Sequence, residues 1–258
     1  MVLADTQTSR LRVRVISVSS RDDRRQHITA NLRDWNLRWE FFDALTSDHH
    51  RYAYDEEQAK LVRGCPLSGG ERGCFGSHVA CMIDFVENSS DDFLLVIEDD
   101  VILDTNFDYA FVVEWMRKLK IDYLRLYSRF AFKARYILEI GQRHLIRFKL
   151  GPFGTQAYII SRSGAAQFLS SMSRCERPID DELDRFWHHH LPPYAIFPYP
   201  VLEVETASTL GRSANQIMET TFSHKMVKRV ETVRRKIANI ILRARDRAMR
   251  RAYLRLRE

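Results

Sequence analysis

Three consecutive carboxylates stand directly after a fully apolar segment in the middle of the chain. The apolar segment is residues 93–97, Phe-Leu-Leu-Val-Ile, and the acids are Glu98, Asp99 and Asp100. A continuous apolar run of this length is typical of a central strand that is covered on both faces. In open α/β sheets, ligands bind beyond the carboxyl ends of such strands. Because adjacent carboxylates repel one another, the triplet favours a bound cation, and its oxygen atoms suit Mn²⁺ or Mg²⁺.

A cation at this place would hold a nucleotide diphosphate and neutralise the charge of a leaving group. The simplest alternative is a solvated acidic turn. A HAD-type phosphatase needs an aspartate nucleophile where this chain has Glu98, and a response-regulator receiver is only about half as long as these 258 residues. The GT-A glycosyltransferases place an Asp-x-Asp-like motif in the middle of the domain, after a nucleotide-binding first strand, and fit best.

The segments around the acidic triplet alternate between strand and helix patterns. Strands are expected at residues 11–18, 37–42, 93–97, 123–127, 136–140, 145–148 and 156–160. Helices are expected at residues 22–35, 55–63, 68–85, 107–119, 163–172 and 180–189. Ser68 and Glu71 form a capping box at the start of the third helix. This order predicts an α/β fold with a mainly parallel sheet. Together with the acidic triplet in the middle of the chain, it gives the expectation of a GT-A-like single nucleotide-binding domain.

The positive charge of the protein is concentrated in its last 38 residues. Residues 221–258 contain 13 Lys/Arg and 3 Asp/Glu, a net charge of +10, whereas residues 1–220 carry a net charge of −4. Apolar residues recur there at three- and four-residue steps from Met226 to Ala248, with Lys and Arg on the other face. This pattern predicts a C-terminal basic amphipathic helix that binds an anionic membrane surface. The alternative is that the apolar face docks onto the domain or onto a second subunit. No nucleic-acid-reading module accompanies the basic segment, so a nucleic-acid partner is not expected.

These patterns predict three segments of the chain: a disordered leader at residues 1–10, the transferase domain at 11–220 and the helical tail at 221–258. The first ten residues have no apolar core of a secretory signal, and no apolar stretch is long enough to span a membrane. The four cysteines show no paired or zinc-like spacing, which indicates reduced thiols. We therefore expect a cytoplasmic protein that associates peripherally with the inner face of the cytoplasmic membrane.

Six sequence blocks in order resemble glycosyltransferase family 25, the lipopolysaccharide and lipooligosaccharide glycosyltransferases related to collagen galactosyltransferases. They include the acidic triplet and span about residues 13–213. The blocks are Val15–Arg25, Glu40–Ala44, Leu67–His78, Val96–Val101, Gly154–Ser161 and Pro178–Leu183.

The resemblance implies an inverting sugar transfer from a UDP-sugar, most often UDP-galactose, to the oligosaccharide of a bacterial lipooligosaccharide or lipopolysaccharide. Inversion requires a general base, and Asp180 and Asp181 are the candidates; their alternative role is to cap the helix that they begin. Glu98 and Asp100 are the expected metal ligands, and Asp99 is a further ligand or a ribose contact. The other residues expected to bind the donor are Val18, Arg24, Asp43, Ala44, Ser68, Glu71, His78, Gly154 and Gln156.

Some of these residues also have plain structural explanations. Glu71 is explained by the capping box alone, and His78 could be a core histidine with satisfied hydrogen bonds. Histidines 188–190 and His224 could supply a further metal ligand or could simply lie in helices. The rival function is a non-catalytic sugar-nucleotide-binding or membrane-scaffold protein that retains the transferase fold.

Overall fold

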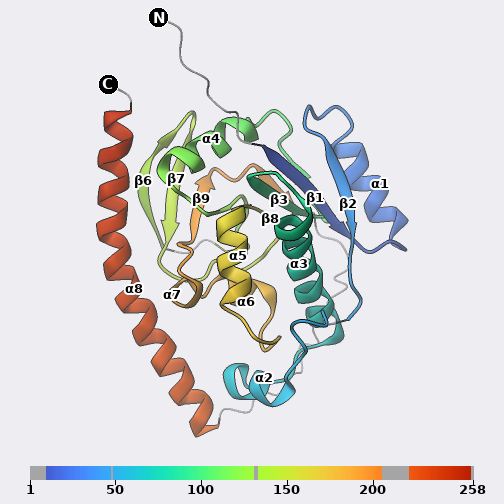
Figure 1. The fold of residues 1–258 in the computed structure, drawn as a ribbon, viewed down its shortest axis with the longest axis vertical. Helices are drawn as coiled ribbons and strands as arrows, with labels where there is room; N and C mark the ends of the chain where they lie inside the picture. Colours follow the sequence, from blue (N-terminus) through green and yellow to red (C-terminus); the bar gives the residue numbers. More distant parts are fainter. Residues whose placement is uncertain (1–9, 48, 131–132, 205–220, 257–258) are drawn as a thin grey trace, which may run out of the picture.

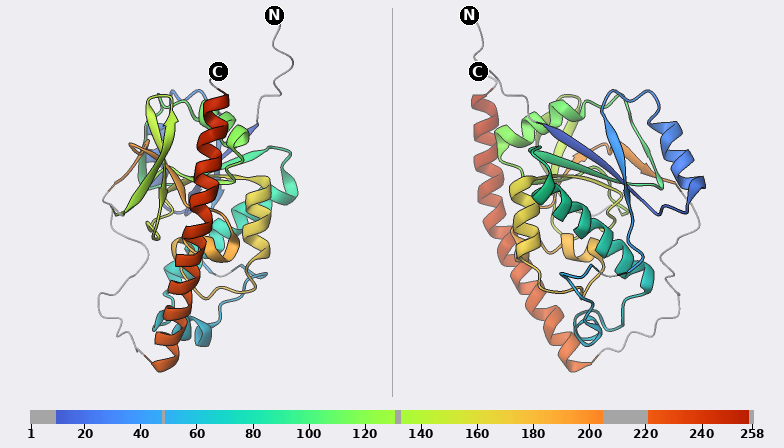
Figure 2. Two further views of the ribbon diagram at one scale, coloured as in Figure 1. Left: turned by 90° about the vertical axis from the view of Figure 1, so that its left-hand side faces the viewer. Right: turned by 45° about the vertical axis from the view of Figure 1, so that its right-hand side comes forward.

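The computed structural model describes residues 10–47, 49–130, 133–204 and 221–256. Residues 1–9, which the sequence assigned to a leader, and residues 205–220 lie outside the described residues. A large central sheet carries helices on both faces, and one long helix runs along the outer edge (Figure 1). The two side views show that this helix extends over most of the height of the molecule (Figure 2).

The central sheet has eight strands in the order β2-β1-β3-β8-β5-β9-β7-β6. Its first three strands are parallel: β1 (Leu11–Ser17) lies between β2 (Trp39–Asp43) and β3 (Phe93–Glu98). The other strands are β5 (Tyr123–Arg125), β6 (Ala134–Ile140), β7 (Arg143–Phe148), β8 (Ala157–Ser161) and β9 (Tyr194–Phe197).

The prediction of a mainly parallel sheet is wrong. Strand β8 runs antiparallel to both β3 and β5, and β7 runs antiparallel to both β6 and β9; in the second half only β5 and β9 are parallel. The sheet is therefore mixed. Side chains alternate with a period of two in either direction, so the sequence pattern does not reveal strand orientation.

Most predicted helices form at the expected places. They are α1 (Asp22–Asn31), α2 (Glu56–Arg63), α3 (Gly69–Asn88), α4 (Tyr109–Leu119) and α5 (Arg162–Ser170). The helix expected at residues 180–189 is instead two short helices, α6 (Ile179–Leu183) and α7 (Phe186–His189). A two-stranded sheet of β4 (Val101–Leu103) and β10 (Val201–Glu203) was not predicted.

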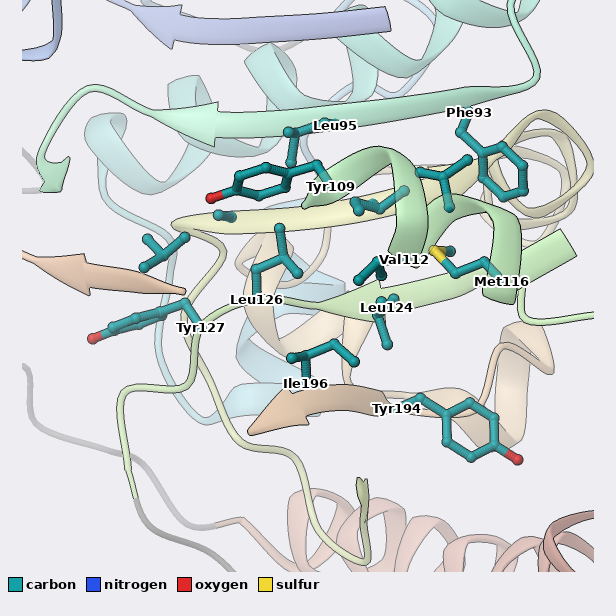
Figure 3. Close-up of a cluster of buried hydrophobic side chains, with 14 of the residues drawn as sticks. Phe93, Leu95, Tyr109, Val112, Met116, Leu124, Leu126, Tyr127, Tyr194 and Ile196 are labelled. Carbon is teal, nitrogen blue, oxygen red and sulfur yellow. The ribbon is translucent and has the colours of Figure 1, made fainter. Parts of the chain in front are cut away.

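Two apolar cores lie on the opposite faces of the central sheet. Helices α3 and α5 cover one face, while α1 and α4 cover the other. Figure 3 shows the second core, in which Leu95, Leu124 and Ile196 from three strands face Val112 and Met116 of α4. Because both faces are covered, every residue of β3 from Phe93 to Ile97 is buried.

The C-terminal segment forms one long helix, α8 (Phe222–Arg255), which packs against the domain. Its buried Asp246 accepts hydrogen bonds from Arg147 at 3.0 Å and from the hydroxyl of Tyr194 at 3.1 Å. Near the end of the helix, Met249 and Tyr253 are buried in the core. Within the described part of the chain, no helix combines the length and the apolar character that a membrane crossing requires.

Candidate active site

A cavity of about 720 Å³ opens at the carboxyl ends of β1 and β3. This volume is in the range of small-molecule sites in proteins. The wall residues come from the end of β1 and the turn after it, from the loop after β2, from the first turns of α3 and from the acidic turn after β3. A smaller hollow shares part of this wall and adds Glu71, Gly154, Thr155 and Asp180. The cavity thus lies where the parallel strands of an α/β sheet present their carboxyl ends.

The first turn of α3 is fixed at the cavity wall by a capping box. Ser68 Oγ accepts a hydrogen bond from the backbone N–H of Glu71, and the carboxylate of Glu71 accepts one from the N–H of Ser68 at 2.9 Å. Arg63 also donates to Glu71, at 2.7 Å. Because Gly69 and Gly70 line the cavity, the positive end of the helix dipole faces it, which favours an anion there.

Gly73 allows α3 to lie directly against the loop that follows β2. A Cβ atom at this position would come within 2.8 Å of the backbone oxygen of Leu45. One turn later, Ser77 Oγ accepts a hydrogen bond from the backbone N–H of Leu45 at 2.8 Å. These contacts place Ala44 and Leu45 in the cavity wall.

Asp99 and Asp100 share one buried arginine from α1. Arg24 donates to Asp99 at 2.9 Å and to Asp100 Oδ2 at 3.3 Å. The other oxygen of Asp100, Oδ1, is buried and has no hydrogen-bond partner among the described residues. Burial, followed by the charge of Glu98, raises the pKa of Asp100 to about 7. Arg24 therefore compensates only part of the negative charge of the acidic turn.

The Glu98 carboxylate contacts Thr155 and His78, the latter in the middle of α3. Its Oε1 accepts a hydrogen bond from the hydroxyl of Thr155 at 2.6 Å and lies 3.4 Å from Nε2 of His78. Burial acts to raise the pKa of Glu98, but the His78 imidazole and the Thr155 hydroxyl outweigh burial and hold the pKa below its ordinary value. His78 is fully buried, and its Nδ1 lies 3.0 Å from the hydroxyl of Tyr158.

A glutamate from β10 organises the part of the wall next to the acidic turn. There the backbone oxygen of Gln156 accepts from the N–H of Glu98, and the N–H of Val204 donates to the backbone oxygen of Asp100, both at 2.8 Å. Glu203 accepts hydrogen bonds from Gln156 at 3.0 Å and from Arg129 at 2.6 Å, and also from the hydroxyl of Tyr127. Gln156 and Arg129 line both the cavity and the smaller hollow. Hydrogen-bonding side chains from the turn before β8, from β10 and from the loop after β5 therefore adjoin the acidic turn in the cavity wall.

Asp180 lies at the rim of the smaller hollow, in the first turn of α6. Its carboxylate lies near the backbone N–H of Gly154, at 3.5 Å, and accepts a hydrogen bond from the N–H of Asp181 at 3.0 Å. Gly154 has φ +80°, a left-handed conformation that favours glycine. The turn at Gly154 therefore brings Thr155 and Gln156 to the cavity beside Asp180.

The model of glycosyltransferase family 25 (LPS biosynthesis protein) matches residues 11–183, about two thirds of the chain. The chain belongs to glycosyltransferase family 25. It is 28% identical over 163 residues to the lipooligosaccharide biosynthesis protein lic2B of Haemophilus influenzae, covering 59% of this chain and 60% of that protein. It is 29% identical over 167 residues to the lacto-N-neotetraose biosynthesis glycosyltransferase LgtB of Neisseria gonorrhoeae, covering 60% and 58%. The match therefore spans about three fifths of the length of these curated relatives.

Most of the site residues that were predicted from the sequence of this family 25 chain lie close together in the structure. Eight line the main cavity: Val18, Arg24, Ala44, His78, Glu98, Asp99, Asp100 and Gln156. Three more line the adjoining hollow: Glu71, Gly154 and Asp180.

The side chains of the other three predicted site residues make structural contacts or lie outside the two hollows. Asp43 pairs with Arg25 and is exposed, and Ser68 caps α3. Asp181 lies next to Asp180 but lines neither hollow among those described, and burial followed by the charge of Asp180 raises its pKa to about 7. The histidines near the end of the domain make local contacts: His189 Nε2 lies 3.1 Å from the carbonyl oxygen of Leu183.

The sequence reasoning missed three residues of the site, Cys74, Arg129 and Glu203. Cys74 could have been found, because it stands one helical turn before His78 on the predicted third helix. Arg129 and Glu203 carry no local signal. They meet only because Arg129 follows β5 while Glu203 ends the unpredicted strand β10.

Proposed function

We propose that this chain is a GT-A-like glycosyltransferase that moves a sugar, in the first instance galactose, from a UDP-sugar to the oligosaccharide of a bacterial lipooligosaccharide or lipopolysaccharide. Membership of family 25 and the names of the relatives support the reaction class. The observation that carries the proposal is a ligand-sized cavity whose wall combines the acidic turn after β3 with the N-terminus of a long helix.

The donor is placed with its diphosphate between α3 and the acidic turn. The positive end of α3 and the guanidinium of Arg24 favour the phosphate charges. Val18 and Ala44, at the ends of two parallel strands, then contact the nucleoside. Gln156, Arg129 and Glu203, in the wall next to the acidic turn, bind the sugar hydroxyls.

The acidic turn fits a divalent cation. Asp100 Oδ1 is a buried carboxylate oxygen without a hydrogen-bond partner in the described part of the chain, and Glu98 lies two residues before it. A hard cation with oxygen ligands suits this donor set. Mn²⁺ or Mg²⁺, held by Glu98 and Asp100, would supply positive charge beside the leaving diphosphate.

Asp180 is the proposed general base. It lies in the hollow that shares Glu98 and Gln156 with the main cavity, so that a sugar between them has the acidic turn on one side and Asp180 on the other. The carboxylate takes the proton of the acceptor hydroxyl as that oxygen attacks the anomeric carbon. Attack from the face opposite to the departing UDP inverts the configuration.

The acceptor is a glycolipid, and α8 is the proposed contact with its membrane. The side chains of Phe222, Val233, Ile237, Ile240 and Ile241 are more than half exposed on α8, although this helix packs against the domain. They stand on a helix whose charged residues are mostly Lys and Arg. Exposed apolar groups flanked by cations suit an anionic lipid surface, which supports the proposal that the enzyme works at the inner face of the cytoplasmic membrane.

The test of this function is the release of UDP from UDP-galactose in the presence of Mn²⁺ and a lipooligosaccharide acceptor. Asp180→Asn keeps the size of the side chain but removes the base, so we expect turnover to fall by about 100-fold or more. Glu139→Gln, at an exposed carboxylate on β6 that lines neither hollow, is the control and should retain wild-type turnover. Equal turnover of wild type and Asp180→Asn would reject the assignment of the base. No turnover by the wild-type protein with any UDP-hexose and acceptor would favour the non-catalytic alternative.

A further inference from the structure

Three potential metal ligands of mixed chemistry meet at the floor of the cavity. Cys74 and His78 are one turn apart on α3, so both side chains lie on the same face of the helix. Glu98 ends β3 directly opposite them. The ligand atoms of these three residues all lie within 4.8 Å of one another. Two packed elements, and not one loop, therefore hold this cluster.

The spacing of two of these atoms already matches a bound metal. In tetrahedral zinc sites the metal–nitrogen and metal–oxygen distances are about 2.0–2.2 Å, which sets neighbouring ligand atoms about 3.3–3.5 Å apart. Nε2 of His78 and Oε1 of Glu98 are separated by 3.4 Å.

The surroundings of His78 also resemble those of a metal ligand. Its Nδ1 lies 3.0 Å from the hydroxyl of Tyr158, and the two rings stack, so that the imidazole is held in one orientation. Its Nε2 is buried and, within the described ranges, faces only the Glu98 carboxylate, at 3.4 Å, without a well-aligned hydrogen bond. Metal-bound histidines are typically oriented by a hydrogen bond at the other ring nitrogen in this way. The hydroxyl of Thr155 orients Glu98 similarly.

We propose that Cys74, His78 and Glu98 form a binding site for a borderline-soft divalent ion of the Zn²⁺ class. A thiolate and an imidazole select such an ion over Mg²⁺, which prefers oxygen ligands only. All three residues line the cavity, so a fourth coordination position faces the bound ligand, as in zinc sites with three protein ligands. The site shares Glu98 with the hard-cation site proposed above and differs from it by its sulfur and nitrogen ligands, and its test does not use the transferase reaction.

Cobalt spectroscopy of the metal-free full-length protein tests this site without any sugar donor. We expect one equivalent of Co²⁺ to produce a thiolate-to-cobalt charge-transfer band together with the intense visible bands of a tetrahedral ion, and Zn²⁺ to displace it. Cys74→Ser should abolish the charge-transfer band. Cys65→Ser is the matched control, since Cys65 is a buried cysteine outside the cavity wall, and it should leave the spectrum unchanged.

A second variant separates coordination from folding. Tyr158→Phe keeps the ring against His78 and removes only the hydroxyl, so we expect the protein to fold and its Zn²⁺ affinity to fall about 10-fold or more. Circular dichroism checks that each variant is folded. The proposal is overturned if the folded wild-type protein shows no charge-transfer band, or if Cys74→Ser shows the same band as wild type. Because UDP release is measured separately, failure of this site and failure of the transferase function are distinguishable.

Discussion

Asp181 is held in an unfavourable electrostatic environment next to the proposed base. Burial, followed by the charges of Asp180 and Asp184, raises its pKa to about 7 from an ordinary value of 3.8, although Arg63 and Arg177 oppose this shift. A carboxyl group whose pKa is raised by folding binds its proton more tightly in the folded state. Its contribution to stability is therefore lost as the pH rises from about 4 through 7.

The variant Asp181→Asn should reveal this effect. At pH 8 the wild-type carboxylate is ionised in the folded protein, so we expect the neutral amide to increase the free energy of unfolding by about 1–3 kcal/mol. At pH 4 both side chains are neutral when folded, and the difference should nearly disappear. Urea unfolding at the two pH values measures it. A variant that is less stable than wild type at pH 8 would show that the carboxylate is well compensated.

At the scale of elements, the packing of α3 against the loop after β2 determines the shape of the cavity. A Cβ at Gly73 would meet the backbone oxygen of Leu45 at 2.8 Å, and a backbone atom cannot rotate away. Gly73→Ala should therefore displace α3 from Ala44 and Leu45, with a loss of about 1–3 kcal/mol of stability and weaker binding of UDP.

Gly69→Ala is the matched control for this prediction. A Cβ at Gly69 meets nothing within 4 Å, and its φ is not positive, so alanine should be tolerated with a stability near that of wild type. Thermal unfolding of both variants provides the comparison, and a UDP titration compares Gly73→Ala with wild type, because Gly69 itself lines the cavity. If Gly73→Ala behaves like Gly69→Ala, the close contact at Leu45 does not shape the site.

The longest and most regular elements were the ones that the sequence could predict. The apolar run of β3 and the capped start of α3 are local patterns, so both were found, and with them the position of Glu98–Asp100. Strands β4 and β10 have only three residues each, too few for a period to be recognised.

Strand direction and long-range contacts could not be read from local patterns. The antiparallel insertion of β8 between β3 and β5 depends on how the chain returns after β7, and alternation is the same in either direction. Contacts between residues far apart in the chain leave no local pattern either. The family resemblance therefore predicted Gln156 as a site residue, whereas Arg129 and Glu203 were not predicted.

At the scale of the whole molecule, α8 contacts the domain through a small set of buried residues and leaves much of its apolar surface exposed. Asp246, Met249 and Tyr253 are buried, whereas Ile240 and Ile241 are 63% and 65% exposed. Docking of the tail onto the domain therefore explains the buried residues near the end of α8 but not the exposed Ile240 and Ile241. The membrane hypothesis accounts for the exposed part.

Sedimentation with vesicles of phosphatidylglycerol and phosphatidylcholine tests the membrane role. Ile240→Ser/Ile241→Ser removes two exposed apolar side chains, each worth about 1.5–3 kcal/mol when fully buried, so we expect binding to weaken by about 10-fold or more. Leu202→Ser changes an equally exposed residue on β10 and should bind like wild type. Unchanged binding of the double variant would show that this part of α8 does not enter the lipid.

The central claim is that the carboxylates after β3 hold a cation that in turn holds the diphosphate of a UDP-sugar. Calorimetric titration of the full-length protein with UDP-galactose, with Mn²⁺ and with a chelator instead, measures this most directly. We predict that removing the metal or introducing Asp100→Asn weakens binding by about 10-fold or more, because the phosphate charge then faces uncompensated carboxylates. Glu139→Gln should bind like wild type, since that exposed carboxylate on β6 lines neither hollow. Equal affinity with and without metal, and in Asp100→Asn, would contradict the account.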